Sequence, residues 1–124
     1  MANLVKKQSF GGPDKQILIA EDSYKVTLGA VIAATGAVDV NGKKILKAGT
    51  PVKGDLKARK TAFVKEATTP NAILLHDVDV TAGANNGTIV VVGCVDLNRL
   101  DTDAAQLITT TVETALPSIK FIKS

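Results

Sequence analysis

The residues best suited to chemistry lie in one stretch, AILLHDVDVTAGANNGTIVVVGCVDL, residues 72–97. His76, Asp77 and Asp79 have the side chains of a metal or acid–base site, and Cys94 has that of a nucleophile. In a regular strand, alternate side chains face opposite sides, so His76 would point away from both aspartates. His76 is also the only histidine, which excludes a His-rich mononuclear metal site within one subunit. We therefore expect the two carboxylates to pair with lysines or to meet backbone donors near a turn.

The other sequence patterns that indicate catalysis are missing. No serine lies in a Gly-x-Ser-x-Gly elbow, and FGGPDK, residues 10–15, is not a phosphate-binding loop. Cys94 is the only cysteine, which excludes an intrachain disulfide, and its apolar surroundings predict a buried, inert thiol. We predict a protein that is not an enzyme, with no catalytic residue, no metal ligand and no cofactor.

Composition indicates one globular domain with an aliphatic core. The chain has 124 residues, of which 45% are hydrophobic and 22% charged, and only 3% are aromatic. No apolar run approaches the roughly 20 residues of a membrane span, and the N-terminus lacks the apolar region of a secretory signal. We therefore expect synthesis in the cytoplasm and no membrane partner.

Charge is distributed unevenly along the chain. Residues 1–66 hold 12 Lys and Arg against 6 Asp and Glu, whereas residues 67–124 hold 3 against 6. This asymmetry predicts a basic face that meets an acidic partner, and a solvated lysine-rich surface is the alternative. Aromatic residues for base stacking are few, and no helix-turn-helix or zinc-finger pattern is present. We therefore expect no direct nucleic-acid partner.

The first half of the chain reads as short strands. Residues 17–20 are apolar enough for a short buried strand, and residues 25–32 alternate with period two. Asn41-Gly42 predicts a hairpin, because both positions of such a turn need positive φ. Residues 55–67 fit a helix, a strand or a loop.

The second half contains the clearest strands. Residues 73–80 and 88–95 flank TAGANNG, which holds a second turn signal at Asn86-Gly87. Both faces of 88–95 are apolar, which predicts a central strand covered on both sides. Gly93 within it predicts a bulge or a close neighbour.

One helix and one strand complete the predicted elements. Residues 101–116 have helical apolar spacing, a cap at Asp101 or Thr102 and a stop at Pro117. The last strand spans 119–123. Upstream, residues 1–16 read as an arm because they have little apolar content and contain Gly11, Gly12 and Pro13. We therefore expect a flexible N-terminal arm, 1–16, and one compact domain, 17–124.

The stretch AILLHDVDVT, a variable turn and GTIVVVGCVDLNRL resemble the C-terminal half of the head decoration proteins of tailed bacteriophages, the family of the lambda head decoration protein. In that family a strand of the LLHDVDVT type precedes a V-x-G-x-V strand, a helix rich in small residues and a short closing strand. This chain has the four in order, at Ile73–Thr81, Val91–Val95, Asp101–Leu116 and Ile119–Lys123. KKILKAGTPVKG also fits the family's central β region.

The resemblance implies an α+β, mostly β fold: a small β-tulip-like barrel or meander with one C-terminal helix. It implies homotrimers on the outer surface of the expanded head in the virion, where they stabilise the shell against the pressure of the DNA. The implied partner is the major capsid protein. An arm with free backbone groups can add a strand to a capsid sheet, and three arms per trimer strengthen attachment. The capsid-binding residues expected in the arm are Asn3, Leu4, Val5, Lys6, Lys7 and Gln8.

Other functions remain compatible with the residues. The nearest alternative is another small virion component, such as a head-fibre base or a tail protein. Further alternatives are an enzyme or small-molecule carrier with its site in the barrel mouth, and a nucleic-acid binder. Ring-forming stoichiometry on tails, a copurifying ligand or a salt-dependent shift of DNA would distinguish these three.

Overall fold

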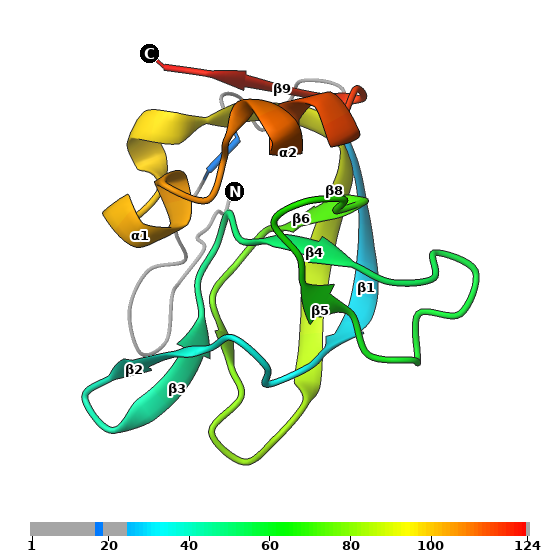
Figure 1. Cartoon of the computed structure of the whole chain (residues 1–124). Helices are drawn as coiled ribbons and strands as arrows, with labels where there is room; N and C mark the ends of the chain where they lie inside the picture. Colours follow the sequence, from blue (N-terminus) through cyan, green and yellow to red (C-terminus); the bar gives the residue numbers. More distant parts are fainter. Residues whose placement is uncertain (1–16, 19–24, 124) are drawn as a thin grey trace, which may run out of the picture.

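The computed structural model describes residues 17–18 and 25–123. This part of the chain is mostly β-structure, as predicted, and it contains two short helices (Figure 1). The larger sheet has the order β1-β8-β6-β4-β5, and β9 pairs with β8 beside this path. Its strands are β1 Val26–Ile32, β4 Pro51–Lys53, β5 Val64–Lys65, β6 Ala72–Leu74, β8 Asn85–Asp96 and β9 Ile119–Ile122. The smaller sheet has the order β2-β3-β7, with bounds β2 Val38–Val40, β3 Lys43–Leu46 and β7 Val78–Asp79.

The sheets do not close into a barrel within the described residues. The larger sheet ends at β1 and β5, and these two edges meet only at an isolated bridge between Ile32 and Phe63. Two backbone hydrogen bonds make this seam: the Phe63 amide donates to the Val31 carbonyl at 2.8 Å, and the Ala33 amide donates to the Phe63 carbonyl at 2.8 Å. The prediction of a mostly β fold is confirmed, and the barrel is open; the named strand pairs are antiparallel, apart from the parallel pair of β8 and β9.

Strand β8 is central, as predicted, and separates two hydrophobic clusters. It pairs with β1, β6 and β9, and two adjacent residues within it, Ile89 and Val90, are fully buried. Because successive side chains of a strand face opposite sides, they enter different clusters. The helix-side cluster contains Ile17, Leu18, Ala48, Ile73, Val90, Val95, Leu100, Ala104, Ile108, Val112, Leu116 and Ile119. The seam-side cluster contains Ala30, Ile32, Leu46, Val52, Phe63, Ala72, Leu74, Val78, Val80 and Ile89.

The hairpin at Asn41-Gly42 is confirmed. Asn41 has φ 53° and Gly42 has φ 84°, so both turn residues have the left-handed conformation that the Asn-Gly pair predicted. The turn joins β2 to β3 with Val40 opposite Lys43. The strand predicted from the alternation of residues 25–32 is also confirmed, and it is β1.

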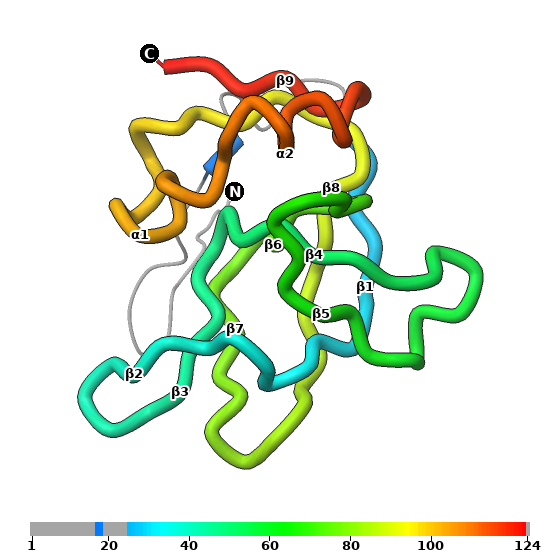
Figure 2. The backbone as a smooth tube through the Cα atoms, viewed as in Figure 1, coloured from blue at the N-terminus to red at the C-terminus, as the bar shows by residue number. Residues whose placement is uncertain are grey.

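The prediction of one strand over residues 73–80 is wrong. This segment contains β6 and β7, which belong to different sheets (Figure 2). β6 pairs with β4 and β8, whereas β7 pairs with β3. Hydrogen bonds from the segment 48–50 hold the crossing. The Gly49 amide donates to the Leu74 carbonyl at 2.7 Å, and the Ala48 amide donates to the Asp77 carboxylate at 2.8 Å.

The prediction of a turn at Asn86-Gly87 is also wrong. Both residues lie in β8, opposite Val31 and Ala30 of β1, and the turn instead contains Gly83 with φ 120°. Packing explains the glycine at position 87, because a Cβ there would lie 2.8 Å from both Ile32 and Val78 side chains. Here the Asn-Gly pair reflects a crowded strand and not a hairpin.

A register shift and a close neighbour both occur near Gly93. Val26 pairs with Val92 and Thr27 with Val90, so Val91 is the extra residue of a bulge. Gly93 itself has a close neighbour, since its Cβ would lie 3.3 Å from Val90 Cγ1. Of the two roles predicted for Gly93, the close neighbour is confirmed.

The single helix predicted over 101–116 is wrong, because two helices are present. They are α1 Thr102–Ala105 and α2 Thr110–Ala115, preceded by the 3-10 turn Leu97–Arg99. Thr109 has extended backbone, with ψ 173°, and its hydroxyl accepts from the Val112 amide at 3.4 Å, so a new helix begins there. Such a local side-chain bond competes with helix continuation. The predicted apolar face persists across the break, with Ala104, Ile108, Val112 and Leu116 buried. Asp101 precedes α1 without a side-chain capping bond, and α2 ends before Pro117 as predicted.

Residues 55–67 form a turn-rich loop and then β5. The loop includes the bonds Ala58 amide to Asp55 carbonyl at 2.9 Å and Thr61 amide to Ala58 carbonyl at 3.0 Å. Phe63 ends the loop inside the seam-side cluster and is fully buried. Of the three readings the sequence left open, the loop and the strand are correct.

The N-terminal end of the described chain is packed into the body. Ile17 and Leu18 are 0% and 2% exposed and belong to the helix-side cluster. Leu18 also bridges Val95 of β8 in antiparallel sense. The rest of the predicted strand 17–20 and the whole predicted arm 1–16 lie outside the described residues.

Candidate functional site

Asp79 is a structural carboxylate that holds the turn after β7. Its Oδ1 accepts hydrogen bonds from the Thr81 amide at 2.9 Å and the Thr81 hydroxyl at 2.7 Å. The Thr81 hydroxyl in turn accepts from the Lys44 amide at 2.8 Å. The Thr81 hydroxyl bond, followed by the Thr81 amide bond and the charge of Lys43, holds the pKa of Asp79 below its ordinary value of 3.8.

Replacing Thr81 by valine is expected to raise the pKa of Asp79 toward its ordinary value, because the strongest hydrogen bond to the carboxylate is lost while the amide bond remains. Since the lowered pKa stabilises the fold only above the ordinary carboxyl range, the stability difference between the two proteins should shrink as pH falls through the folded pKa. An NMR titration of the Asp79 carboxyl carbon measures the shift. Thr69→Val is the control, and an equal shift there would contradict the assignment.

Asp77 and His76 do not form a site with Asp79. Asp77 accepts from the Ala48 amide, and His76 lies in the crossing segment with its Nδ1 buried and without a hydrogen-bond partner among the described residues. No group of His, Cys, Asp and Glu in residues 17–18 and 25–123 could hold a metal ion. The expectation that the two carboxylates meet backbone donors is confirmed, although the regular strand behind it is wrong.

Cys94 differs from its predicted environment. It lies in β8 opposite Lys120 of β9, is half-buried, and belongs to neither hydrophobic cluster. The prediction of a core thiol is therefore wrong: Cys94 faces the side of β8 opposite to Val95, and only Val95 belongs to the helix-side cluster. In the part of the chain that the structure describes, no helix is long and apolar enough to cross a membrane.

The best-built polar cluster fastens the start of the described chain. Asp96 at the end of β8 is fully buried, and its Oδ1 accepts from the Asn98 amide at 3.0 Å. Its Oδ2 lies 3.3 Å from Nε of Arg99, and Arg99 Nη1 donates to the Leu18 carbonyl at 2.8 Å. The Asp96 amide donates to the Ile17 carbonyl at 2.9 Å. We call Asp96, Arg99, Ile17 and Leu18 the N-terminal anchor, since it fastens the first two described residues to the end of β8 and the turn after it.

A second ion-pair cluster ties the smaller sheet to α1. Lys47 Nζ lies 3.4 Å from Asp101 and 3.2 Å from Asp103. The hydrogen bond to Asp103, ahead of the charges of both aspartates, raises the pKa of Lys47 above its ordinary value of 10.5. The three side chains are partly exposed, which makes the cluster a surface brace with a small effect on stability.

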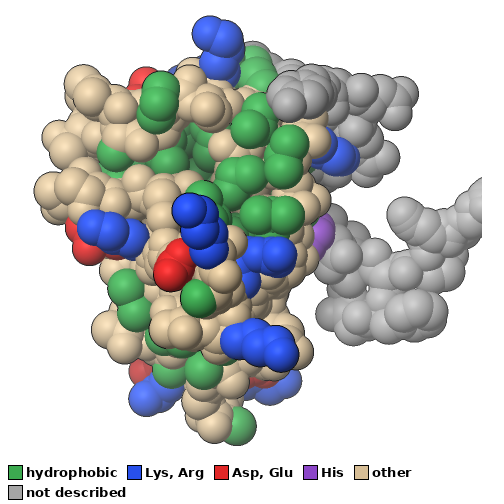
Figure 3. All heavy atoms as spheres, turned by 90° about the vertical axis from the view of Figure 1, so that its right-hand side faces the viewer, with side chains coloured by type: hydrophobic (Ala, Val, Ile, Leu, Met, Phe, Trp, Pro, Cys, Tyr) green, Lys and Arg blue, Asp and Glu red, His purple; other side chains and the backbone are tan. Residues whose placement is uncertain are grey.

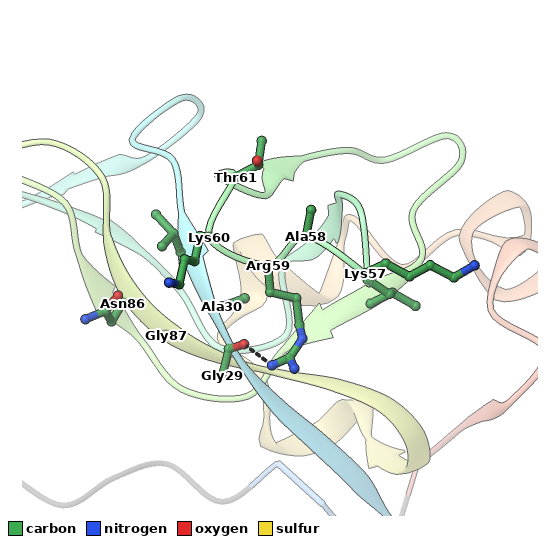
Figure 4. Close-up of a pocket in the computed structure, with 11 residues that line it drawn as sticks. Gly29, Ala30, Lys57, Ala58, Arg59, Lys60, Thr61, Asn86 and Gly87 are labelled. Carbon is green, nitrogen blue, oxygen red and sulfur yellow. Dashed lines mark hydrogen bonds between the residues drawn. The ribbon is translucent and has the colours of Figure 1, made fainter.

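A basic hollow lies between the 55–62 loop and the paired ends of β1 and β8. Its volume is about 740 Å³, and its lining residues are Gly29, Ala30, Val31, Leu56, Lys57, Ala58, Arg59, Lys60, Thr61, Asn86 and Gly87. Figure 4 shows Arg59 reaching to the Gly29 carbonyl and Lys60 turned toward Asn86, while Lys57 extends away from both. The Arg59 bond is 2.7 Å long. Three cations and no carboxylate line this space, so it can attract an anion.

Neither the N-terminal anchor nor the basic hollow was predicted from the sequence. Asp96 and Arg99 contact the carbonyl or amide groups of Ile17 and Leu18, and no local spacing indicates a contact between such distant segments. The basic hollow had only the excess of Lys and Arg in residues 1–66 as a signal. The predicted arm residues Asn3, Leu4, Val5, Lys6, Lys7 and Gln8 lie outside the described residues.

Comparison of the chain with protein-family models and with curated proteins finds no match.

Proposed function

We propose that the protein is a structural decoration protein that binds the outer surface of an expanded phage head as homotrimers. The observation that carries the proposal is the ordered resemblance of residues 72–97 and of the elements after them to phage head decoration proteins. In the proposed role the open, seamed sheet is the β-tulip of that family. The partner is the major capsid protein, and the protein stabilises the shell against the pressure of the packaged DNA.

The architecture supports a passive, binding role. The carboxylates of the motif accept hydrogen bonds from the backbone at positions 48 and 81, so they serve the fold. The N-terminal anchor gives residues 1–16 a firm attachment point at Ile17 and Leu18. A segment attached in this way transmits load from a capsid contact directly into the helix-side cluster, which suits a protein that holds capsomers together.

The proposed attachment uses Asn3–Gln8 as a strand added to an edge of the capsid protein's sheet. Leu4 and Val5 supply apolar side chains, and Lys6 and Lys7 supply positive charge toward acidic capsid surface. Ordering a short segment on binding weakens one contact, but three segments on one trimer act at high effective concentration.

Co-sedimentation with heads that lack this protein tests the proposal. The full chain is expected to saturate expanded heads and to leave unexpanded heads bare. Deletion of residues 1–15 or Val5→Pro, which removes one backbone donor of the added strand, should weaken binding at least about tenfold. Lys120→Gln on β9 serves as the matched control and should bind like the full chain. Binding to tails and not heads would favour a tail protein, and binding to neither would contradict a virion role.

A further inference from the structure

The basic hollow between the 55–62 loop and β1 has the charge of a binding site. Arg59, Lys57 and Lys60 line it, and none of them forms an ion pair with a carboxylate among the described residues. The nearest acid in sequence, Asp55, uses its Oδ1 to accept from the Lys57 amide at 2.8 Å. Figure 3, which views the molecule from the side of this loop, shows more Lys and Arg than Asp and Glu side chains across the middle of the face. A carboxylate entering the hollow would therefore meet unneutralised positive charge.

Arg59 is held in a position that suits recognition. Its Nη1 donates to the Gly29 carbonyl, and its own carbonyl accepts from the Val31 amide at 3.1 Å. The side chain is half-buried and crosses from the loop to the strand (Figure 4). One hydrogen bond uses only part of the guanidinium group, which has five N–H donors in a planar fork. The fixed guanidinium loses less freedom when it binds a carboxylate than a mobile lysine does.

Gly29 is a second, independent observation in favour of a binding site at the basic hollow. Of the eight described glycines, four have positive φ, namely Gly36, Gly42, Gly49 and Gly83. Three others would bring a Cβ to 3.3 Å or less from a neighbouring side chain, namely Gly54, Gly87 and Gly93. Neither a positive φ nor crowding explains a glycine at position 29: its φ is ordinary, and a Cβ there would have no atom within 4 Å. Glycine weakens a strand interior, and one without an internal reason fits the close approach of another backbone.

We propose that the hollow binds an extended acidic segment of a partner protein, with a carboxylate on Arg59 and Lys60 and the segment's backbone passing over Gly29. The apolar part of the lining favours a peptide over a bare anion, because Leu56 is 39% exposed at its rim and Ala58 and Val31 line it. An acidic residue next to an apolar one matches this combination. The site is separate from the capsid-binding segment proposed above and does not depend on it.

Titration of the full, ¹⁵N-labelled chain with an acetylated ten-residue peptide that alternates Glu and Val tests the proposal. Amide signals of residues 29–31, 56–61 and 86–87 are expected to shift with the Glu peptide and not with its Gln counterpart. Lys60→Gln should raise the Kd at least about fivefold, and Gly29→Val should raise it similarly by blocking the approach. Lys120→Gln, which removes an equal charge from β9, should leave the Kd unchanged.

Three results would overturn the proposal. The first is a shift of signals outside the hollow or an equal response to the Gln peptide. The second is binding that Lys60→Gln and Gly29→Val leave unchanged, with thermal unfolding showing that both variants are folded. The third is a different ligand: inorganic phosphate that shifts the same amides as strongly would mean a small-anion site, and a short oligonucleotide that binds them more tightly would mean nucleic acid.

Discussion

Replacing Phe63 by alanine is expected to lower the free energy of unfolding by about 3–5 kcal/mol. Phe63 is fully buried and heads the large side chains of the seam-side cluster. Its ring also lies against Gly54, where a Cβ would come within 2.5 Å of the ring. The backbone of the same residue makes both hydrogen bonds of the seam between β1 and β5. The substitution therefore leaves a cavity at the one point where the two sheet edges meet.

Urea unfolding followed by circular dichroism measures this loss. Val64→Ala is the matched control, because Val64 is the next residue, lies in β5 and is 39% exposed. Its effect should stay within about 0.5 kcal/mol. Phe63→Leu keeps much of the volume and should cost less than the alanine variant. A Phe63→Ala protein as stable as the control would mean that the seam does not hold the fold.

Replacing Asp96 by alanine is expected to lower the free energy of unfolding by about 2–3 kcal/mol. The carboxylate is fully buried, accepts from the Asn98 amide and pairs with Arg99. Its loss leaves the Asn98 amide without this acceptor and removes the group that orients Arg99 toward the Leu18 carbonyl. Arg99 is 41% exposed and can turn to water, which keeps the cost below that of breaking a fully buried pair.

The variant should also loosen the N-terminal anchor before the rest of the fold. Hydrogen exchange is expected to speed up at the Asp96 amide, which donates to the Ile17 carbonyl, more than at the β6 amides. Asp103→Ala is the control, because its ion pair with Lys47 is exposed and should contribute under about 1 kcal/mol. Equal losses of unfolding free energy in both variants would show that the buried Asp96 stabilises the fold no more than the exposed Asp103 does.

The sequence was sufficient for elements that local chemistry determines. The Asn41-Gly42 turn needs only its own two residues, and β1 and the apolar β8 follow from side-chain alternation and burial. It failed where tertiary contacts compete with local pattern. Residues 73–80 have one continuous strand pattern, but hydrogen bonds from the segment 48–50 divide them between two sheets. Residues 101–116 form two helices and not one for a different reason. The Thr109 side chain caps the N-terminus of α2, and this competes with continuation of one helix through Thr109.

The candidate sites show the same division. The structural role of Asp77 and Asp79 could be predicted because a lone histidine argues against a metal site, although the regular strand assumed for residues 73–80 is not present. The hollow could not, since Gly29, Arg59 and Asn86 come together only when the 55–62 loop packs beside β1 and β8. The contrast between Gly29 and Gly87 is likewise invisible in the sequence, where both are glycines in strands.

The N-terminal anchor also has a consequence for biosynthesis. Ile17 and Leu18 are among the first described residues, yet their partners Val95, Asp96 and Arg99 are made much later. During synthesis on the ribosome, the anchor cannot form until β8 and the turn after it have emerged. Contacts between residues so far apart in the sequence form more slowly than local ones such as the hairpin at Asn41-Gly42. The N-terminal anchor therefore forms late in folding. A chain that stops before residue 95 lacks the residues that hold Ile17 and Leu18 in place.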